Sequence, residues 1–212
     1  MALPFNIKYF VQWALLGVLI VFAATYFNSK KNSEARRQLY DLPEPLPVIS
    51  NVSSFSLTNH LGHQMTETDF LDKPWLANII FTRCPTVCPQ ITRKISEVLQ
   101  KLPPDINLVT LTTDPEFDKP KVLYNFAKAN RAIATNWFYL TGDKKTINKL
   151  AINDLKMVSV LKKEDEMESP TDLFIHSSLL VLVDQYGRVR TSFETDSEEL
   201  LSDIQAAIKK LD

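Results

Sequence analysis

This chain of 212 residues has few cysteines, histidines and glycines: two, three and four of each. Two cysteines exclude the small disulfide-rich class of protein, and they exclude a zinc or iron–sulfur site made of four cysteines of this chain alone. Four glycines beside twelve prolines exclude a flexible low-complexity chain. The formal net charge of −1 shows no excess of basic residues, so we expect no nucleic-acid partner.

One long apolar run, residues 9–27, lies near the N-terminus and is interrupted only by Gln12 and Thr25. At about 1.5 Å per residue, a helix over this run spans roughly the 30 Å of a bilayer core. The run is long for the apolar part of a signal peptide, and no cleavage site of small residues follows it. It therefore favours an uncleaved transmembrane anchor after a short tail, residues 1–8.

Residues 28–50 are predicted to form a stalk between the anchor and a globular domain over residues 51–212. The stalk is polar at first and rich in proline between residues 43 and 47, which favours an extended, semi-rigid spacer. Four basic residues between residues 30 and 37 favour a cytoplasmic domain by charge counting alone. Long domains cross membranes largely regardless of such charges, so the orientation stays open from charge.

The domain shows strand and helix patterns in alternation. Strands are predicted at 55–58 and 64–66 (a hairpin), 75–81, 106–112, 137–140, 157–161, 177–183 and 188–193, and helices from Cys84, Asp118, Asp143 and Ser197. Asp118 is expected to act as a helix cap. Alternating strands and helices followed by a late hairpin indicate an α/β fold with a mixed sheet flanked by helices.

The turn after the apolar strand at 75–81 carries both cysteines and reads Thr82-Arg83-Cys84-Pro85-Thr86-Val87-Cys88-Pro89. We predict Cys84 at the N-cap of a helix and Pro85 at its first position. The spacing then places both sulfurs on one helix face, and the helix start favours ionisation of both thiols. Two such thiolates can form a disulfide or bind a soft metal.

This turn resembles that of the Sco/SenC family, membrane-anchored copper proteins that assist the assembly of cytochrome c oxidase. Other matching motifs are Phe55-Ser56-Leu57, Thr112-Thr113-Asp114-Pro115-Glu116 and His176-Ser177 before an apolar strand. The resemblance covers about residues 51–195. It implies a thioredoxin-like fold of the peroxiredoxin-like variant, with an N-terminal transmembrane helix.

The family binds copper through two cysteines and one histidine, which correspond to Cys84, Cys88 and His176. The resemblance thus implies one copper per chain, as Cu(I), Cu(II) or both, and a Cys84–Cys88 disulfide in the oxidised protein. Thiolates select Cu(I), and imidazole binds copper in either oxidation state. Two sulfurs, one nitrogen and a water would also suit zinc, which stays an alternative. Without the resemblance, His176 would be interpreted as an ordinary turn residue.

The chain departs from the family at Ile175, where an aspartate usually precedes the histidine. Such a carboxylate would act on the histidine or on a partner from outside the coordination sphere, so its loss concerns copper transfer more than copper binding. Other polar candidates are weaker. His60 and His63 are expected at a solvated hairpin tip, Met157 in the core, and Asp114 in a turn near the site.

We favour a non-enzymatic copper-binding assembly factor, a metallochaperone or thiol conditioner for the dinuclear copper centre of cytochrome c oxidase. Its partners would be the copper-bearing oxidase subunit or another copper chaperone. The resemblance places it in the bacterial inner membrane with one membrane pass and the domain in the periplasm, or alternatively in the mitochondrial inner membrane.

Two other functions stay open. The second hypothesis is an enzyme, a membrane-anchored thiol–disulfide oxidoreductase in which Cys84 attacks and Cys88 resolves. The three-residue spacer between the cysteines argues against it, since thioredoxins use two. The third hypothesis is an interaction domain with a static disulfide.

Overall fold

The computed structural model of the chain describes residues 22–27, 30, 45–157, 159–161, 174–176 and 178–211. The chain divides into two compact units, Met1–Leu42 and Pro43–Asp212. In the first unit residues 22–27 are helical, and the rest of the predicted anchor lies outside the described residues. Within the described part, no helix has both the length and the apolar character that crossing a membrane requires.

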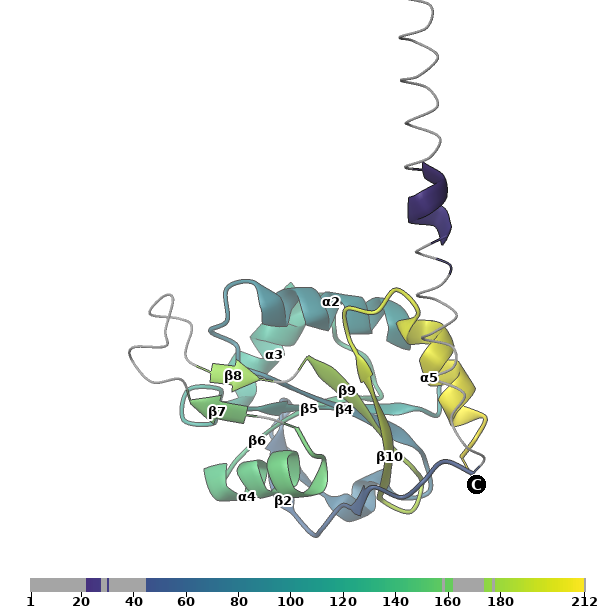
Figure 1. Cartoon of the computed structure of the whole chain (residues 1–212). Coiled ribbons are helices and arrows are strands. Elements are labelled where there is room, and N and C mark those ends of the chain that lie inside the picture. Colours follow the sequence, from purple (N-terminus) through teal and green to yellow (C-terminus); the bar gives the residue numbers. More distant parts are fainter. Residues whose placement is uncertain are drawn as a thin grey trace, which may run out of the picture. The chain divides into compact units, whose positions relative to one another are not determined.

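The second unit is built on a sheet of eight strands in the order β1-β10-β9-β4-β5-β6-β2-β3 (Figure 1). The strands are β1 (Ser50–Asn51), β2 (Ser56–Asn59), β3 (Gln64–Thr66), β4 (Trp75–Ile80), β5 (Asn107–Thr112), β6 (Trp137–Thr141), β9 (Leu179–Val183) and β10 (Arg188–Glu194). β4, β5 and β6 run parallel, and β9 runs antiparallel to β4. The predicted mixed sheet is therefore confirmed. A separate pair joins β7 (Ser159–Leu161) to β8 (Phe174–His176).

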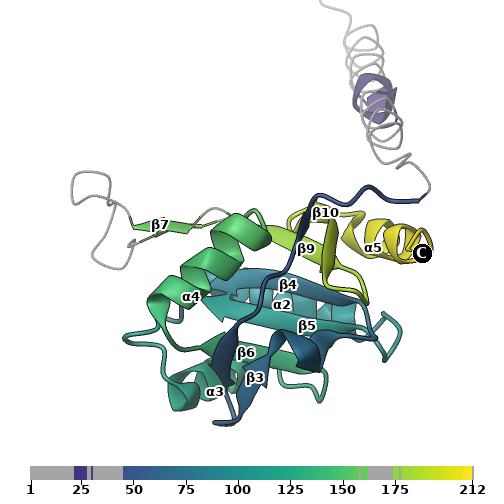
Figure 2. The ribbon, with the colours of Figure 1, turned by 90° about the horizontal axis from the view of Figure 1, so that it is seen from below.

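Helices cover both faces of the sheet. They are α2 (Val87–Leu99), α3 (Pro120–Ala129), α4 (Lys144–Asn148) and α5 (Leu200–Ile208), with a short 3₁₀ helix η1 (Glu67–Phe70) and a π-helical turn η2 (Lys149–Asp154) that continues α4. Figures 1 and 2 show α2 and α4 on opposite faces of the sheet. As predicted, Asp143 begins α4, because its carboxylate accepts a hydrogen bond from the Thr146 amide at 2.8 Å.

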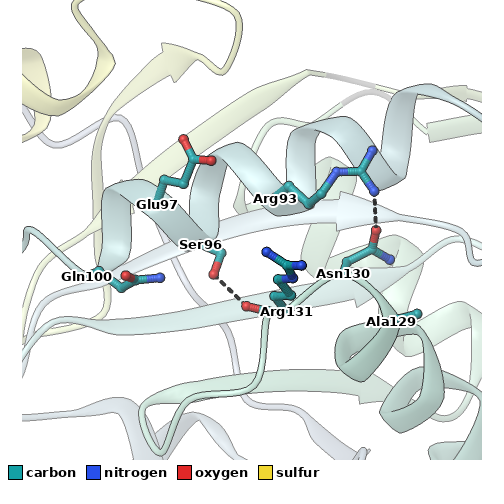
Figure 3. A pocket seen from close by; sticks show the side chains of 7 residues that line it. All are labelled: Arg93, Ser96, Glu97, Gln100, Ala129, Asn130 and Arg131. Carbon is teal, nitrogen blue, oxygen red and sulfur yellow. Dashed lines mark hydrogen bonds between the residues drawn. The ribbon is translucent and has the colours of Figure 1, made fainter.

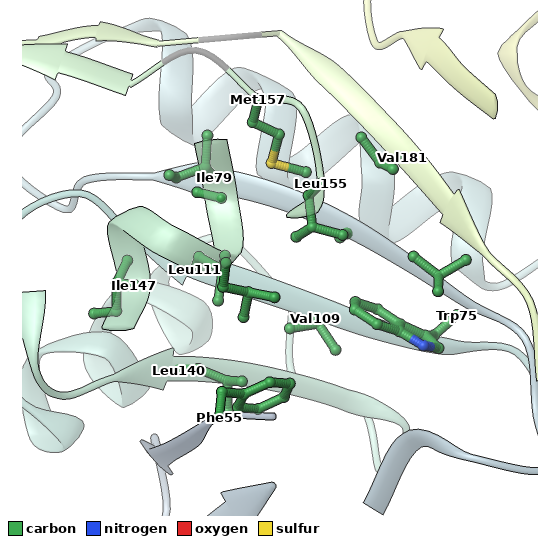
Figure 4. Packing of buried hydrophobic residues seen from close by; sticks show 14 of the residues in the cluster. Phe55, Trp75, Ile79, Val109, Leu111, Leu140, Ile147, Leu155, Met157 and Val181 are labelled. Atoms are coloured by element: carbon green, nitrogen blue, oxygen red, sulfur yellow. The ribbon is translucent and has the colours of Figure 1, made fainter. Parts of the chain in front are cut away.

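A large apolar cluster of the core lies on the face under α4 and η2 (Figure 4). Alternate residues of the central strands point into it, among them Ile79 of β4 and Leu111 of β5, and they meet Ile147 of α4. All six residues of β4 are buried, which agrees with a run that is apolar except for Asn78. Met157 is 1% exposed in the same cluster, so its predicted core position is confirmed.

The last residues of the predicted stalk pack on the domain. Leu46 is buried, and its carbonyl oxygen accepts hydrogen bonds from the guanidinium of buried Arg190, including one of 3.1 Å from Nε. Asp184 in turn accepts from Nη1 of Arg190 at 2.6 Å. Burial opposes ionisation of Asp184, but hydrogen bonds from Arg188 and Arg190 outweigh it and lower the pKa of this carboxyl. The packed domain therefore includes residues before residue 51.

Candidate metal centre

The cysteine turn connects β4 to α2, and the helix begins later than the sequence predicts. α2 starts at Val87 with Thr86 as its N-cap, so Cys84 and Pro85 lie before it. The prediction of Cys84 as the N-cap is wrong, because the Cys84 amide closes a turn onto the carbonyl of Phe81 at 3.3 Å. Cys88 is the second residue of the helix, where backbone amides still lack partners within the helix.

The two cysteines contact each other as thiols, with no disulfide between them. The backbone amide of Cys88 donates to Sγ of Cys84 at 3.4 Å, so the sulfur takes the place that a capping oxygen would fill. Cys84 is 7% exposed and Cys88 is fully buried. A partner therefore reaches Cys84 more easily than Cys88.

The pKa values of the two thiols are shifted in opposite directions. The hydrogen bond with the Cys88 side chain lowers the pKa of Cys84 to about 5, with further help from backbone amides and against the effect of burial. The same hydrogen bond and burial raise the pKa of Cys88 well above its usual value. The prediction that both thiols ionise easily holds for Cys84 and is wrong for Cys88, because a buried site of this size favours one negative charge over two.

Buried Asp118 holds the first residue of the cysteine turn by hydrogen bonds. Asp118 accepts hydrogen bonds from the Thr82 amide at 3.1 Å, from the Thr82 hydroxyl and from the Thr112 hydroxyl at 2.5 Å. Asp118 therefore holds the start of the cysteine turn and does not cap α3, whose N-cap is Lys119. Burial raises the pKa of Asp118, and its charge further opposes ionisation of Cys88.

An ion pair between Arg83 and Asp114 also joins the cysteine turn to the segment after β5. Arg83 donates to Oδ2 of Asp114 from Nη2 at 2.5 Å and from Nε at 3.1 Å. Its guanidinium also lies 4.7 Å from the ring centroid of Phe117. Asp114 therefore lies near the cysteines as expected, and its role there is to position Arg83. The sequence offered no signal for this pairing, since 31 residues separate the two in the chain.

His176 is the last residue of β8, where its backbone pairs with Ser159. The sequence predicts a loop at this position, and the short strand pair replaces it. The side chain of His176 lies outside the described part of the structure. Among the described side chains, no group of three histidines, cysteines or carboxylates is placed to hold a metal ion.

The sheet topology shows near which end of β4 the first residues of β9 lie, and these residues closely follow His176 in the chain. β9 runs antiparallel to β4, and Val181 pairs with Ala77. Residues before Val181 therefore extend toward the carboxyl end of β4. This is the end from which the cysteine turn leaves the sheet.

The histidines of the hairpin differ from their predicted state. His60 is buried, and its Nδ1 accepts a hydrogen bond from the Tyr139 amide at 3.3 Å. Its ring stacks on Tyr124, and burial lowers its pKa. The prediction of a solvated His60 is wrong because α3 and β6 cover that side of the hairpin. His63 is exposed, as predicted.

The chain is similar to proteins of one family along most of its length. The SCO1/SenC family model matches residues 47–210. The SCO1 protein homolog of Bacillus subtilis is 31% identical over 169 residues, which are 76% of this chain and 84% of that protein.

Solved structures agree with this match. Bradyrhizobium japonicum ScoI with copper bound has a TM-score of 0.61 and 26% identity, over 76% of this chain and 98% of that one. BsSco, described as a Sco-family cytochrome c oxidase assembly protein with a disulfide switch, has a TM-score of 0.64 and 29% identity, over 78% and 98%. The matching part makes up 98% of each solved chain, so in those proteins a domain of this extent folds by itself. The fold is the thioredoxin-like α/β fold of these structures, and the chain belongs to the SCO1/SenC family.

Proposed function

We propose that this chain binds copper through Cys84, Cys88 and His176 and acts in the assembly of cytochrome c oxidase. The observation that carries the proposal is the contact between two thiols at a helix start, one of which is already a thiolate at neutral pH. Thiolates are the ligands that select Cu(I). A Sco protein with copper bound and a Sco cytochrome c oxidase assembly protein share this fold.

The chain's own groups supply the chemistry of metal capture. Cys84 offers a thiolate at the exposed side of the turn, and Cys88 must release its proton to become the second ligand. His176 would add a neutral nitrogen. Its backbone comes just before β9, whose first residues extend toward the cysteine turn, and this supports its assignment. An oxidised Cys84–Cys88 pair would offer no thiolate, so disulfide formation and metal binding exclude each other.

Copper titration of the reduced domain, residues 43–212, tests the site. Wild type should bind one Cu(I), and replacing either cysteine by serine should abolish tight binding because a thiolate is lost. His176→Ala should weaken binding at least about tenfold, since even outer partners of metal ligands contribute that much. The matched control is His63→Ala, which removes an exposed imidazole elsewhere.

Two results would contradict this ligand set. Copper affinity unchanged in His176→Ala would remove the histidine from the site. Stoichiometric, tight copper binding by fully oxidised protein would show that the cysteines are not the ligands. Zinc binding tighter than Cu(I) binding in the same assay would assign the site to zinc.

A second candidate function is thiol–disulfide exchange, which the low pKa of Cys84 favours. The Cys84 thiolate would attack a substrate disulfide, form a mixed disulfide and release one substrate thiolate. Cys88 would then lose its proton and attack Sγ of Cys84, which releases the second substrate thiol and leaves the protein oxidised. Insulin reduction with a dithiol as electron donor tests this activity. A rate no higher than that of the dithiol alone would eliminate it.

We further infer a membrane tether and a periplasmic domain, from the apolar run at 9–27 and the proline-rich segment that follows it. An alkaline phosphatase fusion after Asp212 should be active in bacterial cells, since this reporter folds only outside the cytoplasm. Activity of a cytoplasm-specific reporter at the same position would overturn the orientation.

A further inference from the structure

A groove with polar walls runs between α2 and the end of α3, away from the two cysteines (Figure 3). Its volume is about 420 Å³. The residues that line it are Arg93, Ser96, Glu97, Gln100, Ala129, Asn130 and Arg131. Two arginines in one groove give it a strong positive charge, which Glu97 offsets only in part.

The backbone at Arg131 is unusual for a residue with a side chain. α3 ends in a motif in which the Ala132 amide donates to Ala127 and the Arg131 amide donates to Lys128, at 2.9 and 3.2 Å. In this Schellman arrangement the residue at position 131 adopts the left-handed region, where glycine is strongly favoured. Arg131 has φ of 55° there. The backbone conformation alone would favour glycine at position 131. The presence of arginine there therefore points to a role for its side chain.

Neighbouring residues hold both arginines in place. Nη1 of Arg93 donates to Oδ1 of Asn130 at 3.0 Å, and Nδ2 of Asn130 donates to the carbonyl of Phe126 at 2.9 Å. The Ser96 hydroxyl donates to the carbonyl of Arg131 at 2.8 Å, which joins α2 to the end of α3. The guanidinium of Arg93 is therefore held by Asn130, and the backbone that carries Arg131 is held by Ser96, before any ligand arrives.

No carboxylate in the described part of the chain neutralises these arginines. The ion pairs there involve Arg83, Arg188 and Arg190, and neither Arg93 nor Arg131 has one. In Figure 3 the Arg131 side chain points toward α2, and the carboxylate of Glu97 points away from it. Planar guanidinium groups bind phosphate and carboxylate oxygens in a bidentate manner.

A second hollow of about 270 Å³ adjoins the groove and shares Ser96, Gln100 and Arg131 with it. Its other lining residues are apolar (Leu99, Leu102, Pro104, Ile133, Ala134 and Trp137) and polar (Thr135 and Asn136), and its exposed lining is about equally apolar and polar. Ile133 is 48% exposed, so apolar surface is open to a ligand here. A cationic groove beside a hollow that exposes Ile133 suits a molecule with an anionic head and a short apolar tail.

We propose that this groove binds an amphipathic phosphate monoester. Arg93 and Arg131 bind the phosphate group, and the tail lies in the hollow beside Leu99 and Ile133. Arg131 also lies at the negative end of the α3 dipole, but any cation would serve there. The dipole therefore does not explain two arginines that face one groove. This site is independent of the cysteines and of copper.

Binding of monooctyl phosphate to residues 43–212 tests the proposal by calorimetry, with inorganic phosphate and octyl glucoside as probes of head and tail alone. Monooctyl phosphate should bind at least about tenfold more tightly than either. Arg131→Gly should weaken binding by about tenfold or more, as the loss of charged hydrogen bonds predicts. Because glycine suits the backbone at 131, this variant should fold normally and gain about 2 to 4 °C in Tm.

Two further variants complete the test. Arg93→Gln should weaken binding to a similar extent. Lys128→Gln removes one positive charge from the last turn of α3 without touching the groove, so its affinity should equal that of wild type. Unchanged binding in Arg131→Gly and Arg93→Gln, or equal loss in Lys128→Gln, would overturn the proposal. Equal affinity for inorganic phosphate would assign the site to free phosphate and exclude the amphiphile.

Discussion

The two faces of the central sheet use the same strands for different purposes. On the face under α4, Ile79 and Leu111 belong to a cluster made only of apolar side chains. On the face toward α2, the alternate positions of the same strands include Asn78, Thr110 and Thr112, which are all buried. Apolar contacts have no preferred direction, so the first face contributes mainly to stability.

Directional bonds organise the second face. Trp137 donates from Nε1 to the Thr110 hydroxyl at 2.8 Å, and that hydroxyl donates to Asn78 at 2.7 Å. At the end of the same strand, Thr112 donates to Asp118, which holds Thr82 at the start of the cysteine turn. A buried polar group destabilises the fold unless it forms a hydrogen bond. Each of these bonds therefore restricts the conformations that the cysteine turn can adopt. Leu76, Ile80 and Leu108 are also buried on this second face, so it contributes to stability as well. Its polar residues position the site, and we call it the polar face; the face under α4 is the apolar face.

The largest expected effect concerns the thiols at the end of the polar face. In the reduced domain, the rate of Cys84 alkylation by iodoacetamide should reach half its maximum near pH 5, against about 8.5 for a free cysteine. The rate should fall below this pH, because the thiolate becomes protonated. In Cys88→Ala the midpoint should rise, since the hydrogen bond from Cys88 is the main cause of the low pKa. A wild-type midpoint near pH 8 would show that the turn does not stabilise the thiolate.

A substitution on the apolar face should affect stability without changing the site. Leu111→Ala leaves a cavity among fully buried residues, and it should lower the free energy of unfolding by roughly 3 kcal/mol in urea denaturation. The pH midpoint of Cys84 alkylation should stay at its wild-type value while the protein is folded. A shifted midpoint in folded Leu111→Ala would break the division between the two faces.

The smallest of these expected effects on stability comes from substitutions of Asp118, which holds the start of the cysteine turn. Asp118→Ala removes the acceptor of three hydrogen bonds, and it should lower the free energy of unfolding by about 2 kcal/mol. Asp118→Asn keeps an acceptor oxygen, so it should lose less. Cu(I) affinity should also fall in Asp118→Ala, in contrast to Leu111→Ala. Equal losses for the two Asp118 variants would show that shape, and not hydrogen bonding, matters at this position.

Much of the domain could be predicted from local pattern. The run from Trp75 to Ile80 predicts a buried strand because all its residues except Asn78 are apolar, and the structure agrees. Asp143 was identified as a helix start because a cap bonds to an amide three residues away. The cysteine spacing predicts that Cys84 and Cys88 lie together, and they do, although Cys84 belongs to the turn before α2 and not to the helix.

Errors arose where a side chain had two possible partners. Asp118 precedes a helix and has the properties of a cap, but Thr82 and Thr112 bind its carboxylate instead. His60 follows a strand in a turn, yet Tyr124 and Tyr139 cover it. In both cases the deciding partners lie far away in sequence, so no local pattern contains them.

The sequence by itself determined most of the strands, though not β1 or β8, and it determined the cysteine pair, the family and so the fold, because each depends on periodicity, spacing or local motif. Only the tertiary structure decided which cysteine ionises. Helix position alone favours both thiolates, whereas burial of Cys88 and the charge of Asp118 leave its proton in place. The tertiary structure also decided that Arg93 and Arg131 face one groove, since one lies on α2 and the other just after α3, and the packing of these helices brings them together. Desolvation and contacts between distant segments exist only once the chain has folded.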